Sequence, residues 1–149
     1  YVDGEQVVLL NGENVNAYLR TEEVGNMAST TSAQPAVRTK LVELQQALAA
    51  KSDVIMDGRD IGTVVLPHAQ VKIYLTASSM VRAKRRYDEL TAKGQESDFE
   101  VIKKDIEDRD YRDMHRETSP LKQAEDAVLV DTSDMTIEQV IDRIVELIG

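Results

Sequence analysis

Short apolar runs that alternate with longer amphipathic segments constrain the fold of this chain more than any other sequence feature. Three runs have the length of a strand: 53–57, 71–75 and 127–131. Helical periodicity follows them over about 78–93, from about 97 and from about 136. This alternation is typical of parallel strands covered by helices. The sequence therefore predicts an α/β fold with a parallel core sheet and helices on both faces, although three strands make a thin sheet.

The first 52 residues carry other local signals. Asn11-Gly12 lies between two strand-like runs and predicts a small hairpin. Residues 20–33 favour a helix of modest quality, and Pro35 suits the first turn of a better helix that ends near Lys51. Four apolar residues at helical spacing predict the buried stripe of this better helix: Val37, Leu41, Leu44 and Leu48.

Capping patterns predict where two later helices begin. Ser97 and Glu100 have the spacing of a capping box, and so do Thr136 and Gln139. The helix after Thr136 has the clearest apolar stripe in the chain: Ile137, Val140, Ile141, Ile144, Val145 and Ile148.

The overall charge argues against some classes of partner. The 149 residues include 18 Lys and Arg against 27 Asp and Glu, a net charge of -9, which is unfavourable for coating nucleic acid or an acidic membrane. There is no run of 18 apolar residues and no signal-peptide pattern at the start, so we expect a cytoplasmic protein. With no Cys and only two His, we expect no thiolate chemistry and no metal ligands.

Asp57-Gly58-Arg59-Asp60 directly follows the first apolar run. Ligands of parallel sheets bind at the carboxyl ends of strands, which is where this segment is expected. Arg59 could present a two-pronged donor to an anion, and the carboxylates could accept hydrogen bonds, around a glycine that permits a tight bend. A turn with an exposed ion pair explains the same residues without a ligand.

Basic residues concentrate in the middle of the chain. Residues 82–122 hold 11 of the 18 Lys and Arg. The spacing of Arg109, Arg112, Asp113 and Arg116 predicts one shared helix face, and a phosphate would suit the guanidinium groups there. An ion-paired helix is the alternative, since Asp105/Arg109, Asp108/Arg112 and Arg109/Asp113 are spaced i,i+4. An earlier helix carries Arg82, Arg85 and Arg86 on one face, for which a solvated surface is the simpler interpretation.

Two segments together resemble the bacterial cytidylate kinase family of nucleoside monophosphate kinases: Asp57–Pro67 (DGRDIGTVVLP) and Arg109–Pro120 (RDYRDMHRETSP). Residues 12–29 are similar to the family's monophosphate-binding insert, and 71–90 to a core strand with its following helix. The resemblance implies part of a P-loop kinase fold. It assigns 1–52 to a partial CMP-binding insert, 53–80 and 123–149 to the core, and 81–122 to helices with an Arg-rich lid.

The resemblance also implies an activity. It implies transfer of the terminal phosphoryl group of ATP, with Mg²⁺, to CMP or dCMP, giving CDP or dCDP in pyrimidine nucleotide metabolism. The partners would be these nucleotides, without nucleic acid or membrane, and the complete protein would be a monomer. Preference for CMP or dCMP stays open. Another nucleoside monophosphate kinase with different base selection is the nearest alternative enzyme.

Individual residues match the family's positions as follows. Ser29, Arg38 and Asp60 match positions that hydrogen-bond the cytosine. Arg59 and Arg116 match those that hold the monophosphate, and Arg109 and Asp113 those near the ribose hydroxyls and the phosphate path. Of these, Arg59, Arg109 and Arg116 are the expected catalytic residues. More weakly, the ATP side is matched by Arg82, Arg85 and Arg112.

The family's Gly-rich phosphate loop is missing from this sequence. The seven glycines form no G-x-x-x-x-G-K pattern. By the resemblance, the chain starts inside the insert, and the absent portion includes the central strand and most of the ATP and Mg²⁺ ligands. We therefore expect this chain alone to be inactive. The alternative from another class is a non-catalytic nucleotide-binding or interaction module without the loop.

Overall fold

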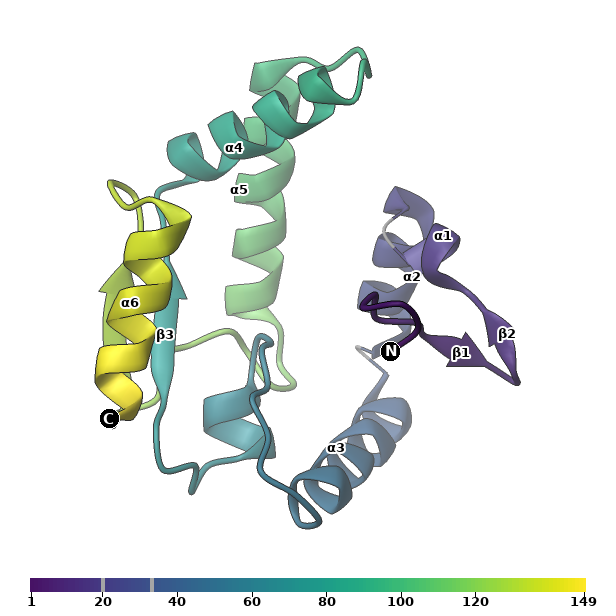
Figure 1. Ribbon diagram of the computed structural model, residues 1–149, viewed down its shortest axis with the longest axis vertical. Coiled ribbons are helices and arrows are strands. Elements are labelled where there is room, and N and C mark those ends of the chain that lie inside the picture. The colour runs from purple at the N-terminus through teal and green to yellow at the C-terminus, as the bar shows by residue number, and fades with distance from the viewer. Residues whose placement is uncertain (20, 33) are drawn as a thin grey trace. The chain divides into compact units, whose positions relative to one another are not determined.

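The computed structural model describes residues 1–19, 21–32 and 34–149, without the side chains of residues 22, 26 and 29. The chain forms two compact units, Tyr1–Leu48 and Ala49–Gly149. Figure 1 shows the elements in chain order. In the described ranges, no helix is long and apolar enough to cross a bilayer.

The first unit contains the predicted hairpin. Strands β1 (Leu9–Leu10) and β2 (Glu13–Asn14) pair antiparallel. Asn11 and Gly12 have φ values of 53° and 89°, the left-handed backbone that a tight two-residue turn requires. The Asn16 side chain fastens the hairpin, because its Oδ1 accepts from the Val8 N–H and its Nδ2 donates to the Gln6 carbonyl.

Three helices follow the hairpin: α1 (Asn16–Leu19), α2 (Glu22–Ser32) and α3 (Pro35–Ala49). Both predicted helices are confirmed, although residues 20 and 33, the ends predicted for the first one, lie outside the described residues; α3 begins at Pro35 as expected. The buried stripe predicted for α3 is wrong. Its four members are 36–56% exposed, since no described element of the first unit covers them.

The second unit contains a two-stranded parallel sheet. Strands β3 (Ile73–Thr76) and β4 (Val128–Asp131) pair in register from Ile73↔Val128 to Thr76↔Asp131. The helices of this unit are α4 (Ser79–Ala92), α5 (Phe99–His115) and α6 (Ile137–Ile148). The predicted alternation of strands and helices is thus confirmed at two of the three strand positions.

The third predicted strand, 53–57, does not form. A strand needs a neighbour to satisfy its backbone hydrogen bonds, and no described residue pairs with this segment. Ile55 within it is 94% exposed. A single π-helical turn, η1 (Ile61–Val65), follows this segment and places Val65 among the few fully buried side chains.

Side-chain caps define the starts of the later helices. The Thr136–Gln139 capping box at α6 is confirmed. The Ser97 box at α5 is wrong, because Asp98 caps the helix by accepting from the Glu100 and Val101 amides at 2.8 and 3.1 Å. Ser97 Oγ is buried without a hydrogen-bond partner in the described chain. An extended Asp98 puts its carboxylate oxygen within reach of two amides in the first turn.

Candidate functional site

The Asp57–Asp60 loop is anchored through the backbone of Asp60. The Asp60 carbonyl accepts hydrogen bonds from the Val64 and Val65 amides of η1 at 2.8 and 3.2 Å. Asp60 itself is 4% exposed. Arg59 precedes this anchored residue and is half-buried. Its side chain therefore starts from a held backbone position, and part of it remains exposed to solvent.

The C-terminal end of α5 provides the second part of the site. Asp113, in the last turn, is buried at 6% exposed. The chain turns back just beyond the helix, where Arg116 Nε donates to the Ser119 carbonyl at 2.6 Å and the Leu121 amide donates to the Asp113 carbonyl at 2.8 Å. Ser119 has a φ of 51°, which this reversal requires. The turn holds Arg116 next to Asp113.

Three guanidinium groups converge on the Asp113 carboxylate. Arg59 Nε lies 2.9 Å from Asp113 Oδ2, and Arg109 Nε lies 3.9 Å from the same oxygen. Arg116 Nη1 lies 3.9 Å from Oδ1. We call Arg59, Arg109, Asp113 and Arg116 the arginine cluster. It joins a loop and a helix end that are about 50 residues apart in the sequence, and it carries two more positive than negative formal charges.

Two buried atoms of the arginine cluster have no hydrogen-bond partner in the described part of the chain: Asp113 Oδ2 and Arg116 Nη2. Arg59 Nε is at ion-pair distance from Oδ2, but no N–H points at that oxygen with hydrogen-bond geometry. An unsatisfied buried polar group costs about 1–3 kcal/mol. A ligand with anionic acceptors and hydroxyl donors would satisfy both atoms.

The helix face predicted for this cluster is only partly correct. The helix ends at His115, so Arg116 is its extended C-cap residue and reaches Asp113 through the turn. Arg112 is exposed, and its Nε donates to the backbone carbonyl of Asp108 at 3.3 Å. Of the predicted i,i+4 pairs, Arg109–Asp113 forms an ion pair.

Two predicted base-binding residues lie in the first unit. Arg38 is half-buried on α3. Ser29 is in α2, but its side chain lies outside the described residues. The third, Asp60, is buried beside Arg59 in the second unit.

Arg82 and Arg85 of α4 bind acceptors within the second unit. Arg82 makes a two-pronged pair with Asp110 of α5 at 3.1 and 2.5 Å and also donates to the Ala77 carbonyl. This hydrogen bond with Asp110 raises the pKa of Arg82 above its ordinary value. Arg85 donates to the side chain and the carbonyl of Thr132, just after β4, at 3.2 and 2.6 Å. Both residues therefore join α4 to neighbouring elements.

Lys72 is a structural residue that our sequence reasoning missed. Its ammonium group donates to both carboxylate oxygens of Asp126 at 2.9 and 2.7 Å and to the Pro67 carbonyl. The lysine side chain is 7% exposed. A lysine inside an apolar run could have indicated a buried ion pair. Its partner Asp126 is 54 residues away, however, and rules of helix or strand spacing do not reach that far.

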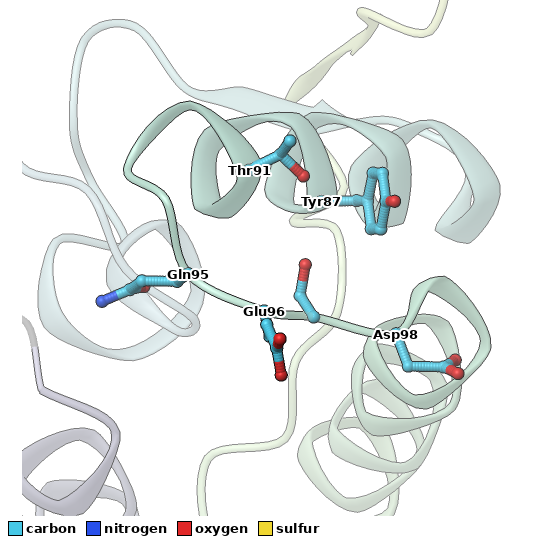
Figure 2. A pocket seen from close by; sticks show the side chains of 6 residues that line it. Tyr87, Thr91, Gln95, Glu96 and Asp98 are labelled. Carbon is cyan, nitrogen blue, oxygen red and sulfur yellow. The ribbon is translucent and has the colours of Figure 1, made fainter.

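A surface hollow lies at the tip of the α4–α5 hairpin, and none of the residues predicted to bind nucleotide lines it. Figure 2 shows its lining, which comes from the end of α4 and the loop before α5: Tyr87, Thr91, Gln95, Glu96, Ser97 and Asp98. Beside it, Tyr87 and Phe99 pack edge to face with centroids 6.2 Å apart. No residue of the arginine cluster lines this hollow.

The described residues offer no ligand set for a divalent cation. No group of three or more His, Asp or Glu side chains among them is arranged to hold a metal ion. The described residues therefore do not fit Mg²⁺, and the sequence includes no Gly-rich loop of the G-x-x-x-x-G-K pattern for the ATP phosphates.

Known proteins are similar to this chain over almost its whole length. The cytidylate kinase family profile matches residues 2–149. Cytidylate kinases of Lactobacillus johnsonii and Lactobacillus gasseri are each 53% identical over 146 residues, which cover 98% of this chain and 64% of the relative. A cytidylate kinase of Streptococcus pneumoniae (strain Hungary19A-6) is 53% identical over 141 residues, 95% of this chain and 63% of that protein. The chain thus spans less than two-thirds of these relatives' length, and it belongs to the cytidylate kinase family.

Proposed function

We propose that the complete protein transfers the terminal phosphoryl group of ATP to CMP or dCMP, giving CDP or dCDP, and uses Mg²⁺. The convergence of three guanidinium groups at Asp113 is the observation that carries this proposal. Phosphoryl transfer needs positioning and stabilisation of charge more than covalent chemistry from the protein, and convergent arginines supply both. The relatives are named cytidylate kinases, which supports the choice of cytidylate as acceptor.

Each cluster residue has a proposed task. Arg59 and Arg116 hold the monophosphate, and Arg109 neutralises charge along the path of the transferred group. Asp113 accepts hydrogen bonds from the ribose hydroxyls. Ser29, Arg38 and Asp60 select the base through polar contacts with the cytosine.

Three arginines are assigned to the ATP side of the site: Arg82, Arg85 and Arg112. Arg112 is exposed and can turn toward a phosphate. Arg82 and Arg85 each use three hydrogen bonds internally, and a guanidinium has five N–H donors, so each could still donate to ATP. Mg²⁺ and most of the ATP contacts are assigned to residues outside this chain.

A coupled kinase assay with ATP, Mg²⁺ and CMP tests the activity. We expect turnover from a protein that includes the family's Gly-rich loop and none from the 149 residues alone. Titration with CMP, dCMP, UMP and AMP tests the base. Preferred phosphorylation of UMP or AMP would contradict the assignment to cytidylate. Nucleotide binding by the longer protein without turnover would favour a non-catalytic binding module.

A further inference from the structure

Asp113 occupies the position that an anion would take among the three arginines. Its carboxylate is the common partner of Arg59, Arg109 and Arg116, at 2.9, 3.9 and 3.9 Å. The side chain is only 9% exposed, so water screens these charges weakly. Any anion that binds these arginines therefore approaches a buried negative charge.

An anion that binds the cluster competes with Asp113 for the arginines, and this competition costs free energy. An anion that draws Arg59 away leaves Asp113 buried and less compensated, and uncompensated buried charge is strongly unfavourable. Asp113 Oδ2 already has no hydrogen-bond donor among the described residues. A ligand recovers this cost only if it brings donors to Asp113 while its anionic group takes Arg59.

Free phosphate and a nucleotide differ in where they carry hydrogen-bond donors for Asp113. Inorganic phosphate carries its negative charge and its P–O–H donors on one small group, so a P–O–H that donates to Asp113 brings the phosphate charge against the carboxylate. A nucleoside monophosphate carries sugar hydroxyls several ångströms from its phosphate, and these can donate to the carboxylate.

We propose that Asp113 is a specificity-determining residue that excludes free inorganic phosphate from the arginine cluster while admitting a nucleoside monophosphate. The inference rests on the proposed function, because it takes a nucleotide as the ligand. It adds that the same carboxylate lowers the affinity of the cluster for a bare anion.

Binding measurements on the 149-residue chain test this proposal. Inorganic phosphate and CMP are titrated separately by calorimetry into the wild type and Asp113→Asn, which removes the charge and keeps the shape. We expect phosphate affinity to rise about tenfold in Asp113→Asn and the ratio of CMP to phosphate affinity to fall, since about 1.4 kcal/mol corresponds to tenfold. Phosphate that binds Asp113→Asn no more tightly than the wild type would overturn the proposal.

Two further variants separate the role of this carboxylate from general charge. Asp108→Asn makes the same change at an exposed position of α5 and should leave phosphate affinity unchanged. Asp113→Glu keeps the charge and should continue to exclude phosphate. If phosphate affinity rose equally in Asp108→Asn, net charge alone would explain the effect. That result would contradict the role assigned to Asp113.

A measurement on the wild type covers the case in which Asp113→Asn fails to fold. The Nε–H resonance of Arg59 in NMR reports its pairing with Asp113. CMP should shift this resonance at concentrations at which inorganic phosphate does not, whereas equal shifts would overturn the proposal. Failure of the complete protein to phosphorylate CMP would remove the proposed function, but phosphate exclusion is measured by binding alone and would stand.

Discussion

At the residue scale, the two glycines on either side of Arg59 and Asp60 differ in the space around them. A side-chain carbon added at Gly58 would lie 3.0 Å from Ile61 Cγ1 and 3.2 Å from Cδ1. At Gly62, two residues past Asp60, it would meet Lys72 Cδ at an ordinary 3.5 Å. An added methyl group therefore makes ordinary contacts at Gly62, whereas at Gly58 it requires the Ile61 side chain to move by a few tenths of an ångström.

Gly58→Ala should lower the free energy of unfolding by about 1 kcal/mol, because Ile61 must shift to relieve the contact. Urea unfolding measures this change. Gly62→Ala is the matched control, and we expect it to be neutral or slightly stabilising in a helical turn. Equal effects of the two substitutions would show that contact with Ile61 is not the cause.

Arg59→Ala should weaken CMP binding about tenfold or more and leave cytidine binding unchanged. A hydrogen bond to a charged group contributes about 1.5–3 kcal/mol, and only CMP carries the phosphate. Calorimetric titration of both ligands checks the difference. Arg143→Ala removes an arginine of α6 that pairs with Glu146 and should change neither affinity. Unchanged CMP affinity in Arg59→Ala would contradict the assignment of Arg59 to the monophosphate.

At the scale of elements, polar contacts join segments that sequence patterns treat separately. The α4–α5 hairpin is held by Arg82 with Asp110 and by a hydrogen bond of 2.8 Å from Ser79 Oγ to Glu107. Lys72 joins Pro67, after η1, to Asp126, before β4. These contacts position the arginine-bearing segments within the second unit.

Asp98→Ala should destabilise α5 by about 1 kcal/mol, the usual cost of losing an N-cap side chain. Ser97→Ala, one residue earlier, should have little effect, because Ser97 Oγ caps nothing in the described chain. Thermal unfolding followed by circular dichroism compares the two variants. A larger loss in Ser97→Ala would instead support the capping box expected from the sequence.

Asp126→Asn should destabilise the protein at neutral pH and not in acid. The hydrogen bond from Lys72 holds the pKa of Asp126 below its usual value, so its contribution is present above the unfolded pKa and is lost as pH falls through the folded one. Urea midpoints of wild type and variant should differ at pH 7 and converge only when the pH falls below the lowered pKa of Asp126 in the folded protein. Asp134→Asn, at an exposed position after β4, is the control. A difference that persists in acid would exclude the ion pair as its source.

At the scale of the whole molecule, little apolar surface is fully buried. The buried apolar residues of the described chain are Val65, Ala77, Ala83 and Val130. One stripe of α6 stays 54–76% exposed: Ile137, Ile141, Val145 and Ile148. Because burial of apolar surface is the main favourable term in folding, we infer that this chain has a low stability for its length.

The 149-residue chain should unfold in a broad transition at a lower temperature than a protein that carries the family's full core. Unpaired sheet edges and exposed apolar side chains contribute little to cooperativity. Differential scanning calorimetry of both proteins checks this expectation. A sharp transition of the monomeric short chain within the usual mesophilic range of about 45–65 °C would contradict it.

The sequence alone determined the features that depend on neighbouring residues. The Asn11-Gly12 turn, the start of α3 at Pro35 and the Thr136–Gln139 box were predictable because each is formed within about four residues. The resemblance in the Asp57–Pro67 and Arg109–Pro120 segments likewise identified the family.

Only the tertiary structure decided the features that need a distant partner. Segment 53–57 has strand-like sequence but forms no strand, because pairing depends on a neighbour that the described residues do not supply. Arg116 lies beyond its predicted helix and reaches Asp113 through a turn. Arg59 meets the same carboxylate from a remote loop. Spacing rules describe one helix or strand at a time, whereas the arginine cluster depends on where two segments come together in space.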